Sequence, residues 1–504
     1  MAFTVSRAIK WWAWDKPDRV ALDYEGEIVT YSALYSWALR VAAWLREQGV
    51  SPGDRVMMVG ENSLEYAMLI LGTTLVGAIS APISFRSSER ELAQSIALLS
   101  PKLVFADRGR EEIVSAALGA AAQELLHLFD PIRPLRDAPE PSPAHEAKPE
   151  DPMFIIGTSG STGTPKGVIY TQGSTMVYSA EFAIMEPGTA NGGSVLAAGP
   201  YSSASGTLLL HQFLSVGATI FAENKFTPER ALTMLTGHKL TTFLASTVFY
   251  ERIAALPEFE QADLSTIKFA QISGARVSAA LLARYQEKGV TLRQAYGCTE
   301  AGGAWAARDE TAFTSPEKCG PGAMFSEFAV VRPDGGVAPA GEAGEILIRS
   351  PAVAAGYWND PEQTAKTFKD GWLHTGDRGV LDDRGNLTFI DRIKDIIISG
   401  GLNVSAMEVE SAIAEIDGVV EVVVMAAKDA EFGETPLAII HADQAKVDVR
   451  TVLSHCRTVL AAYKVPRYVV FEAEPFARLP SGKIAKVTVR EKYKEVPAFL
   501  ERVR

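Results

Sequence analysis

A run of small and hydroxylated residues from Thr158 to Gly167, TSGSTGTPKG, offers the clearest chemistry in the sequence. It follows the apolar segment MFII and carries the positive charge of Lys166 near its end. Glycines let a backbone approach a ligand closely, and hydroxyl groups donate hydrogen bonds to phosphate oxygens. The glycine and lysine spacing differs from both the P-loop and the dinucleotide fingerprint. The pattern indicates a phosphate-binding loop of another type, with a flexible surface turn as the alternative.

This loop closely resembles the TSGTTGxPKG signature of adenylate-forming enzymes. That superfamily contains acyl- and aryl-CoA synthetases, the adenylation domains of peptide synthetases, and luciferase. Further motifs of the superfamily follow in its order over residues 158–483, so the resemblance covers almost the whole chain. It assigns the binding of ATP or AMP to the loop residues Thr158, Ser159, Gly160, Ser161, Thr162, Gly163 and Lys166.

The segment AYGCTE, residues 295–300, resembles the family motif YGxTE. By this resemblance Tyr296 stacks on adenine, and Thr299 is a catalytic residue that binds the α-phosphate. Glu300 is also catalytic and helps to hold Mg²⁺, together with Thr162. A π face, a hydroxyl group and a carboxylate oxygen suit these ligands. The other nucleotide-binding residues that the resemblance assigns here are Ala295 and Gly297, and, in an SGGAP-like loop, Gly274, Ala275 and Arg276.

Two motifs in the last third of the chain imply contacts with the ribose and a hinge. The segment WLHTGD resembles WxxTGD, which implies that Asp377 accepts hydrogen bonds from the ribose hydroxyls. The segment DRIKD resembles GRxKD, with Asp391 in place of the usual glycine. There Arg392 is expected to reach ribose or phosphate, and Lys394 is expected to be the hinge about which a small domain turns.

Two lysine- and glycine-containing loops complete the set of motifs. SGGLNV resembles the SGGxNV loop, so Ser399, Gly400 and Gly401 are expected to face CoA once the small domain has rotated. PSGKI resembles PxGKI, which makes Lys483 the expected catalytic lysine between the substrate carboxylate and the α-phosphate. The segment that resembles GEL…GY and ends at Tyr357 is interpreted as structural.

One departure from the family pattern concerns the acyl group. The segment usually written PLFHxxG reads PYSSASG here, so Ser203 stands where a histidine or an aromatic residue is common. Small residues also follow Glu300, which favours a roomy pocket. Alternatively, the side chain of Tyr201 or Trp305 occupies the space that the small residues leave. The acyl pocket is assigned to Tyr201, Ser202, Ser203, Gly302 and Gly303.

Strand and helix patterns alternate from the N-terminus to about residue 296, which predicts parallel sheets covered by helices. Residues 131–150 are rich in proline and charge and are interpreted as an exposed loop. Residues 66–85 carry no charge, and we interpret them as a buried helix to Val76 and a short strand rather than a membrane span.

The expected fold class is therefore α/β, with two domains. Residues 1–392 are predicted to form a large N-terminal domain of doubly wound sheets, with a β-rich subdomain over residues 325–390. Residues 393–504 are predicted to form a small mobile α+β domain that carries the catalytic lysine and the CoA-facing loop.

Composition excludes several classes of protein. The 504 residues are 47% hydrophobic and 22% charged, which suits a chain with a large core. With 61 acidic and 49 basic residues the net charge is -12, unlike that of a general binder of nucleic acid or anionic membrane. The three cysteines are far apart, so neither a disulfide framework nor a zinc cluster is expected, and a cytoplasmic protein is predicted.

These features together predict an ATP-dependent acyl-CoA synthetase that uses ATP, Mg²⁺ and CoA. Its expected partners are a small carboxylic acid, ATP and CoA, and no nucleic acid. No integral membrane segment is expected. A homodimer is an open alternative. The small residues favour a medium- or long-chain fatty acid, or a bulky aryl or branched alkanoic acid. The alternatives are an acyl-adenylate ligase that loads a separate carrier protein, and a non-catalytic regulator that binds adenylates.

Overall fold

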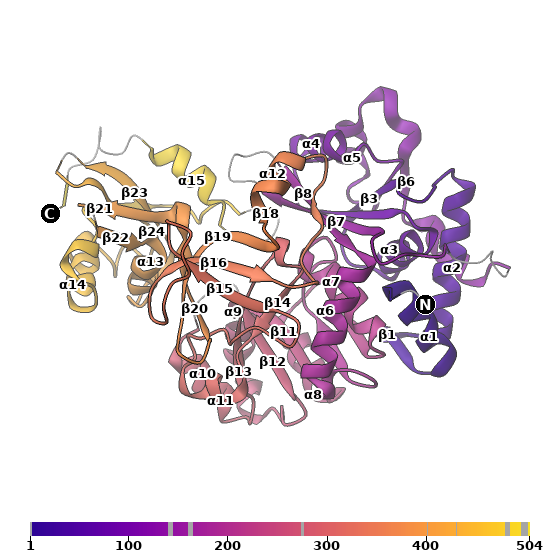
Figure 1. Cartoon of the computed structure of the whole chain (residues 1–504), viewed down its shortest axis with the longest axis horizontal. Helices are drawn as coiled ribbons and strands as arrows, with labels where there is room; N and C mark the ends of the chain where they lie inside the picture. The colour runs from indigo at the N-terminus through magenta and orange to yellow at the C-terminus, as the bar shows by residue number, and fades with distance from the viewer. Residues whose placement is uncertain are drawn as a thin grey trace. The chain divides into compact units, whose positions relative to one another are not determined.

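The computed structural model describes residues 3–139, 145–159, 165–273, 277–400, 402–429, 431–478, 484–494 and 502–503. The chain divides into two compact units. The first comprises Met1–Phe328 and Leu347–His374, and the second comprises Ala329–Ile346 and Thr375–Arg504. The proposed boundary of the mobile domain at residue 392 concerns movement, and it stays a prediction. Figure 1 labels the elements of both units.

A seven-stranded sheet forms one layer of the first unit. Its order is β17 (Gly356–Tyr357), β8 (Pro165–Thr171), β7 (Pro152–Ser159), β4 (Ile79–Ser84), β3 (Arg55–Gly60), β5 (Leu103–Ala106) and β6 (Leu126–Leu128). The strands from β7 to β6 pair in parallel, whereas β7, β8 and β17 pair antiparallel. The phosphate-loop motif therefore joins two antiparallel neighbours at one side of this sheet.

An eight-stranded sheet forms another layer of the same unit. Its order is β14 (Gly303–Ala306), β13 (Leu292–Cys298), β12 (Phe269–Ser273), β11 (Thr242–Ser246), β9 (Ser194–Ala197), β10 (Thr219–Ala222), β1 (Val20–Tyr24) and β2 (Glu27–Thr30). All neighbours pair in parallel except the two hairpins at the edges. The predicted doubly wound α/β architecture is confirmed.

Helices connect and cover these strands (Figure 1). They are α1 (Val5–Asp15), α2 (Tyr31–Glu47), α3 (Leu64–Val76), α4 (Glu89–Leu99), α5 (Glu111–Leu118), α6 (Gln172–Met185), α7 (Ala204–Ser215), α8 (Pro228–Gly237), α9 (Thr247–Ala254), α10 (Ala279–Gln286), α11 (Asp309–Thr314) and α12 (Pro361–Thr367). Helix α3 is almost entirely buried and ends at Val76, before strand β4, so the interpretation of residues 66–85 is confirmed. In the described part of the chain no helix is long and apolar enough to cross a membrane.

The prediction of an exposed loop over residues 131–150 is wrong for its first part. Residues Asp130–Asp137 form 3-10 turns, and Ile132 is fully buried there. The Trp37 Nε1 donates to the Ile132 carbonyl at 2.9 Å, and Arg136 pairs with Glu27 at 2.7 Å. Proline and charge suggested a loop, but prolines also fix the backbone angles of tight turns, and a single apolar side chain is enough to anchor them.

A third sheet corresponds to the β-rich region. It contains β15 (Glu327–Val331), β16 (Gly344–Arg349), β19 (Trp372–Leu381) and β18 (Phe368–Lys369), and β20 (Leu387–Arg392) also pairs with β19. Short strands separated by Asp-Gly and Arg-Gly turns predicted such a region. The prediction is confirmed.

The C-terminal part of the second unit is an α+β fold, as predicted. Its sheet has the order β22 (Leu402–Ser405), β21 (Ile396–Ser399), β24 (Gly433–Ala442) and β23 (Val419–Asp429), with β25 (Tyr468–Glu472) beside β24. Its helices are α13 (Ala406–Ala414), α14 (Val449–Val459) and α15 (Lys486–Tyr493). Helix α15 was not predicted, because the basic sequence around it shows little apolar periodicity.

Candidate active site

The end of strand β13 presents the central motif. Tyr296 lies in this strand, and Thr299 and Glu300 follow in a 3-10 turn, Thr299–Ala301. The Tyr170 hydroxyl of strand β8 donates to the Thr299 carbonyl at 2.6 Å. A contact between the two large sheets of the first unit therefore fixes the backbone of the turn.

The Glu300 carboxylate is held by a residue that sequence analysis interpreted as structural. The Tyr357 hydroxyl donates to Glu300 Oε1 at 2.8 Å, and the Lys166 Nζ lies 5.0 Å from the centre of the Tyr357 ring. Burial and the charge of Glu300 raise the pKa of Tyr357, so its phenol keeps the proton that it donates. Tyr357 therefore contacts residues of two motifs: its ring lies near the Lys166 ammonium, and its hydroxyl group binds the Glu300 carboxylate. Sequence spacing gives no signal of this.

The phosphate-loop motif is a β-hairpin at its ends. Thr158 in β7 pairs with Lys166 in β8, and Ser159 pairs with Pro165. A Cβ on Gly167 would lie 2.7 Å from the Ile155 side chain, so strand packing requires this glycine. The tip of the motif, Gly160, Ser161, Thr162 and Gly163, lies outside the described residues.

The assigned adenine contacts are described in part. Tyr296 is 6% exposed, and its ring meets Phe328 edge to face at 6.0 Å. A Cβ on Gly297 would lie 2.3 Å from the Gly303 carbonyl, so the pairing of β13 with β14 accounts for this glycine. Ala295 is buried in the same strand. Gly274, Ala275 and Arg276 lie outside the described residues, and the adenine-binding role stays a prediction.

In the second unit, Asp377 and Arg392 lie opposite each other on strands β19 and β20. The Arg392 Nε and the Asp377 Oδ1 are 3.5 Å apart, with Asp377 almost buried and Arg392 more than half exposed. The pair joins a carboxylate that can accept from hydroxyl groups to a guanidinium that can donate to a phosphate. Their assignment to ribose and phosphate remains a prediction.

Asp391, the departure from the family's glycine, has a clear structural partner. Its Oδ2 accepts from the Ser405 hydroxyl at 2.6 Å and from the Met407 amide at 3.0 Å, at the start of helix α13. A carboxylate at a helix N-terminus accepts hydrogen bonds from the free amides there and interacts favourably with the positive end of the helix dipole. These bonds connect the residues on the two sides of Lys394, the predicted hinge. Burial and the charge of Arg392 lower the pKa of Lys394.

Helix α15 is tied to the segment next to the hinge. The Arg490 guanidinium pairs with Asp395 at 2.7 Å, and Lys486 pairs with the partly buried Glu410 of helix α13 at 2.6 Å. The loop before α15 contains Lys483, which lies outside the described residues. The two ion pairs nevertheless fasten the helix that follows this lysine by three residues.

The residues assigned to CoA lie at the turn between β21 and β22. Ser399 is 1% exposed, and Gly400 has a φ of 60° and donates its amide to the Phe432 carbonyl at 2.9 Å. This left-handed conformation favours glycine. Gly401 lies outside the described residues, and the CoA-facing role stays a prediction.

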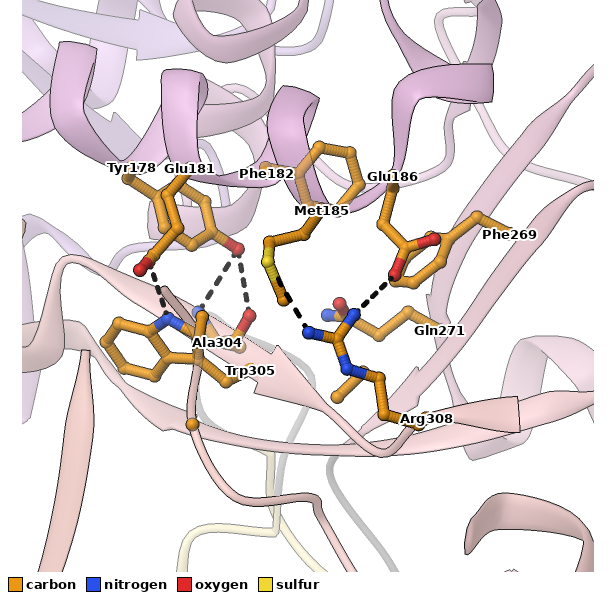
Figure 2. A pocket seen from close by; sticks show the side chains of 13 residues that line it. Tyr178, Glu181, Phe182, Met185, Glu186, Phe269, Gln271, Ala304, Trp305 and Arg308 are labelled. Atoms are coloured by element: carbon orange, nitrogen blue, oxygen red, sulfur yellow. Dashed lines mark hydrogen bonds and ion pairs between the residues drawn. The ribbon is translucent and has the colours of Figure 1, made fainter. Parts of the chain in front are cut away.

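The residues assigned to the acyl pocket have structural roles of their own. Ser203 caps helix α7, because its hydroxyl accepts from the Gly206 amide at 3.1 Å, and Ser202 lies beside it with partial exposure. Tyr201 is 1% exposed. Gly302 has a φ of 72°, and a Cβ on Gly303 would lie 2.2 Å from the Tyr178 ring. The aromatic ring that occupies the space beside Gly303 is therefore Tyr178 (Figure 2), which sequence analysis did not consider.

Comparison with known proteins decides the family. The profile described as AMP-binding enzyme matches residues 9–358, and that of the AMP-binding enzyme C-terminal domain matches residues 408–483. The chain belongs to the AMP-binding enzyme family. The resemblance that the motifs indicated is confirmed.

Relatives of this AMP-binding enzyme match over nearly their full length. Feruloyl-CoA synthase from an Amycolatopsis species is 34% identical over 486 residues, 95% of this chain and 96% of the relative. A long-chain-fatty-acid–CoA ligase from Mycobacterium tuberculosis is 32% identical over 471 residues, 92% and 93% of the two chains. The ATP-bound crystal structure of MatB from Rhodopseudomonas palustris has a TM-score of 0.88 and 27% identity, covering 98% of this chain and 100% of that one. The chain is an AMP-forming acid–thiol ligase.

The described residues of the enzyme contain no group of three or more His, Cys, Asp or Glu side chains that could hold a metal ion. A single carboxylate such as Glu300 suits Mg²⁺, which usually keeps several waters and binds through one or two carboxylates and substrate phosphates. The other predicted magnesium ligand, Thr162, lies outside the described residues.

The Tyr357–Glu300 contact leads to a prediction. We expect Tyr357→Phe to lower kcat/KM for ATP in pyrophosphate release by about 10-fold, the scale for one hydrogen bond to a charged group. The Mg²⁺ concentration for half-maximal rate should rise as well, because the Glu300 carboxylate loses its orientation.

Tyr170→Phe is the matched control, since it removes a tyrosine hydroxyl bonded to the neighbouring Thr299 carbonyl. This neutral bond should matter less, by about 3-fold. Equal losses in the two variants, with an unchanged Mg²⁺ requirement, would contradict the positioning role of Tyr357.

Proposed function

We propose that the enzyme is an ATP-dependent acyl-CoA synthetase. In the first step a carboxylate oxygen attacks the α-phosphorus of ATP, so that acyl-AMP forms and pyrophosphate leaves. In the second step the CoA thiol attacks the acyl carbon, the bond from acyl carbon to phosphate oxygen breaks, and AMP leaves as the thiol proton is lost. The observation that carries the proposal is the assembly of Lys166, Tyr357 and Glu300 beside the turn of Thr299.

The first step needs positioning and charge neutralisation rather than a protein nucleophile. The ammonium of Lys166 would oppose the charge of the triphosphate, and the Thr299 hydroxyl would donate to the α-phosphate. Glu300, oriented by Tyr357, would hold Mg²⁺, which supplies charge compensation to the phosphates when bound. Lys483 would bridge the substrate carboxylate and the α-phosphate.

The second step is proposed to follow rotation of the small domain about Lys394. Rotation would withdraw Lys483 and bring Ser399, Gly400 and Gly401 toward the acyl-adenylate. Asp377 and Arg392 would hold the ribose and phosphate through both steps. One site can perform two reactions in this way, because a conformational step separates them.

The acid is proposed to be a medium- or long-chain fatty acid, or a bulky aryl or branched alkanoic acid. The names of two relatives, a feruloyl-CoA synthase and a long-chain-fatty-acid–CoA ligase, support this range for the chain. Both names also support free CoA as the acyl acceptor.

The decisive experiment is a panel of straight-chain and aryl acids incubated with ATP, with and without CoA. Pyrophosphate, AMP and acyl-CoA are measured separately. We expect pyrophosphate release with the preferred acids, and acyl-CoA together with AMP only when CoA is present. Pyrophosphate release without acyl-CoA would favour a ligase that loads a carrier protein, and no release with any acid would contradict the proposed range of acids.

A further inference from the structure

The turn between strands β21 and β22, which is assigned to CoA, rests on the segment that joins β23 to β24. The Gly400 amide donates to the Phe432 carbonyl of that segment at 2.9 Å, and Ser399 pairs with Gly433 at the start of β24. A Cβ on Gly400 would lie 2.9 Å from the Phe432 ring. The backbone and the ring of Phe432 therefore fix the position of the Gly400 turn.

Two guanidinium groups lie against the Phe432 ring. The guanidinium carbon of Arg467 lies 3.8 Å from the ring centre, and that of Arg502 lies 5.4 Å from it. Arg467 is 6% exposed and donates to the Thr435 hydroxyl at 2.9 Å. Cations at these distances are attracted to the face of an aromatic ring. The ring that supports the Gly400 turn is thus itself held by two charged side chains.

Arg502 also contacts the acidic side chains beside Phe432. Its Nη1 donates to Glu431 Oε2 at 2.9 Å, and its Nε lies 3.9 Å from Asp429 Oδ2. The Asp429 side chain is 2% exposed. Its Oδ1 accepts from the amides of Glu431 and Phe432 at 2.9 and 3.0 Å. Arg502 therefore compensates the charge of a buried carboxylate that shapes the Phe432 segment.

The residue after Arg502 anchors this part of the chain. The Val503 amide donates to the Arg467 carbonyl at 2.9 Å, and the Val503 side chain packs against the apolar core of the C-terminal α+β fold. That core includes Val404 of strand β22. Arg502 and Val503 are thus held by backbone, apolar and charged contacts, rather than by a single surface ion pair.

These contacts should affect the position of the Gly400 turn more than the stability of the fold. The Arg502 side chain is 35% exposed, and ion pairs at such sites contribute little to stability. A displacement of about 1 Å in a group that positions a substrate can nevertheless lower a rate by about 100-fold. The rate of the second half-reaction should therefore respond to Arg502 more strongly than the melting temperature does.

We propose that Arg502 is a positioning residue for the transfer of the acyl group to CoA. It acts through Phe432, which sets the position of the Gly400 turn toward CoA. The inference rests on the proposed function, because this turn faces CoA only in the second half-reaction. The first half-reaction does not use the turn, so Arg502 has no part in the formation of acyl-AMP.

The first test is the variant Arg502→Ala, with the two half-reactions measured separately. Thioester formation is followed with supplied decanoyl-AMP or cinnamoyl-AMP and increasing CoA, and acyl-AMP formation is followed by pyrophosphate release in a single turnover. We expect kcat/KM for CoA to fall by about 10-fold and acyl-AMP formation to stay within about 2-fold of the wild type. Arg502→Lys keeps a cation beside Phe432 and Glu431, so its kcat/KM for CoA should stay within about 3-fold of the wild type.

Lys446→Ala is the matched control. Lys446 pairs with Asp417 at 3.4 Å at the opposite end of the β23–β24 hairpin, so this variant also removes one exposed ion pair from the same sheet. It should change neither half-reaction by more than about 2-fold. Both variants should melt within a few degrees of the wild-type enzyme, because exposed ion pairs contribute little to stability.

A double-mutant cycle tests the route through Phe432. Phe432→Leu keeps an apolar side chain and removes the ring that the guanidinium groups contact. It should also lower kcat/KM for CoA, and the addition of Arg502→Ala should then change this value by less than about 2-fold. Independent effects of the two substitutions would show that Arg502 acts by another route and would overturn the inference.

Two outcomes of the first test would also overturn the inference while the proposed function stands. One is an unchanged kcat/KM for CoA in Arg502→Ala. The other is an equal loss in both half-reactions, which would indicate a general structural role. A failure of the proposed function looks different, because the wild-type enzyme would then form acyl-AMP but no acyl-CoA.

Discussion

Replacing Lys483 with alanine is expected to lower acyl-adenylate formation by about 10²-fold or more, the scale for losing one group that stabilises a developing anion. The carboxylate and the α-phosphate repel each other in this step, and one ammonium between them removes the repulsion. The second half-reaction has no such pair of anions. Thioester formation from supplied acyl-AMP should therefore be spared.

Single-turnover measurements of acyl-AMP formation and of thioester formation check this prediction. Lys492→Ala is the matched control, because Lys492 lies on helix α15 after the same loop and pairs with Glu472 at 2.5 Å on the surface. It should change neither step by more than about 2-fold. Equal losses in both half-reactions of Lys483→Ala would show that this lysine does not act in adenylation alone.

Lys394→Pro is expected to have the opposite effect to Lys483→Ala: it should spare acyl-adenylate formation and impair thioester formation. Proline fixes φ near -65° and removes the amide donor, so the backbone at the predicted hinge can no longer turn. Pyrophosphate exchange should persist, whereas acyl-CoA formation should fall by more than about 10-fold, as for variants that block a required closure. Lys394 lies in the 3-10 turn Ile393–Asp395, where a proline can be accommodated.

The hydrogen bonds of Asp391 to Ser405 and Met407 allow a second test of the hinge, with the variant Asp391→Ala. They join residues on the two sides of Lys394, so a rotation at Lys394 must break them in each turnover. Asp391→Ala should then change the ratio of acyl-AMP to acyl-CoA formation as well as stability. A pivot before residue 391 would leave the bonds intact. In that case Asp391→Ala would cost only about 1 kcal/mol of stability, and Lys394→Pro would leave turnover unchanged.

The sequence by itself determined the family, the order of the motifs and much of the element pattern. Each of these signals is local. The helix that ends at Val76 and the strand after it depend on apolar periodicity and on turn residues within about twenty positions. Local signals failed where one distant contact decided the structure, as for Ile132, whose burial turned an expected loop into 3-10 turns.

Only the tertiary structure decided which motif residues meet. Tyr357 reaches Glu300 across 57 positions of the chain, and the pairing of β17 with β8 is what places Tyr357 near Lys166. No spacing rule predicts such a contact, because it depends on how the strands are ordered in the sheet.

Glycines and polar residues show the same limit. A small residue at position 303 suggested room for a substrate, but the Tyr178 ring from another helix lies there. Asp391 departs from the family motif, and the sequence gives no reason for it. The structure supplies the reason, because its carboxylate accepts hydrogen bonds at the start of helix α13. Residue type is fixed by the sequence, whereas the space and the partners around a side chain are set by elements that only the fold brings together.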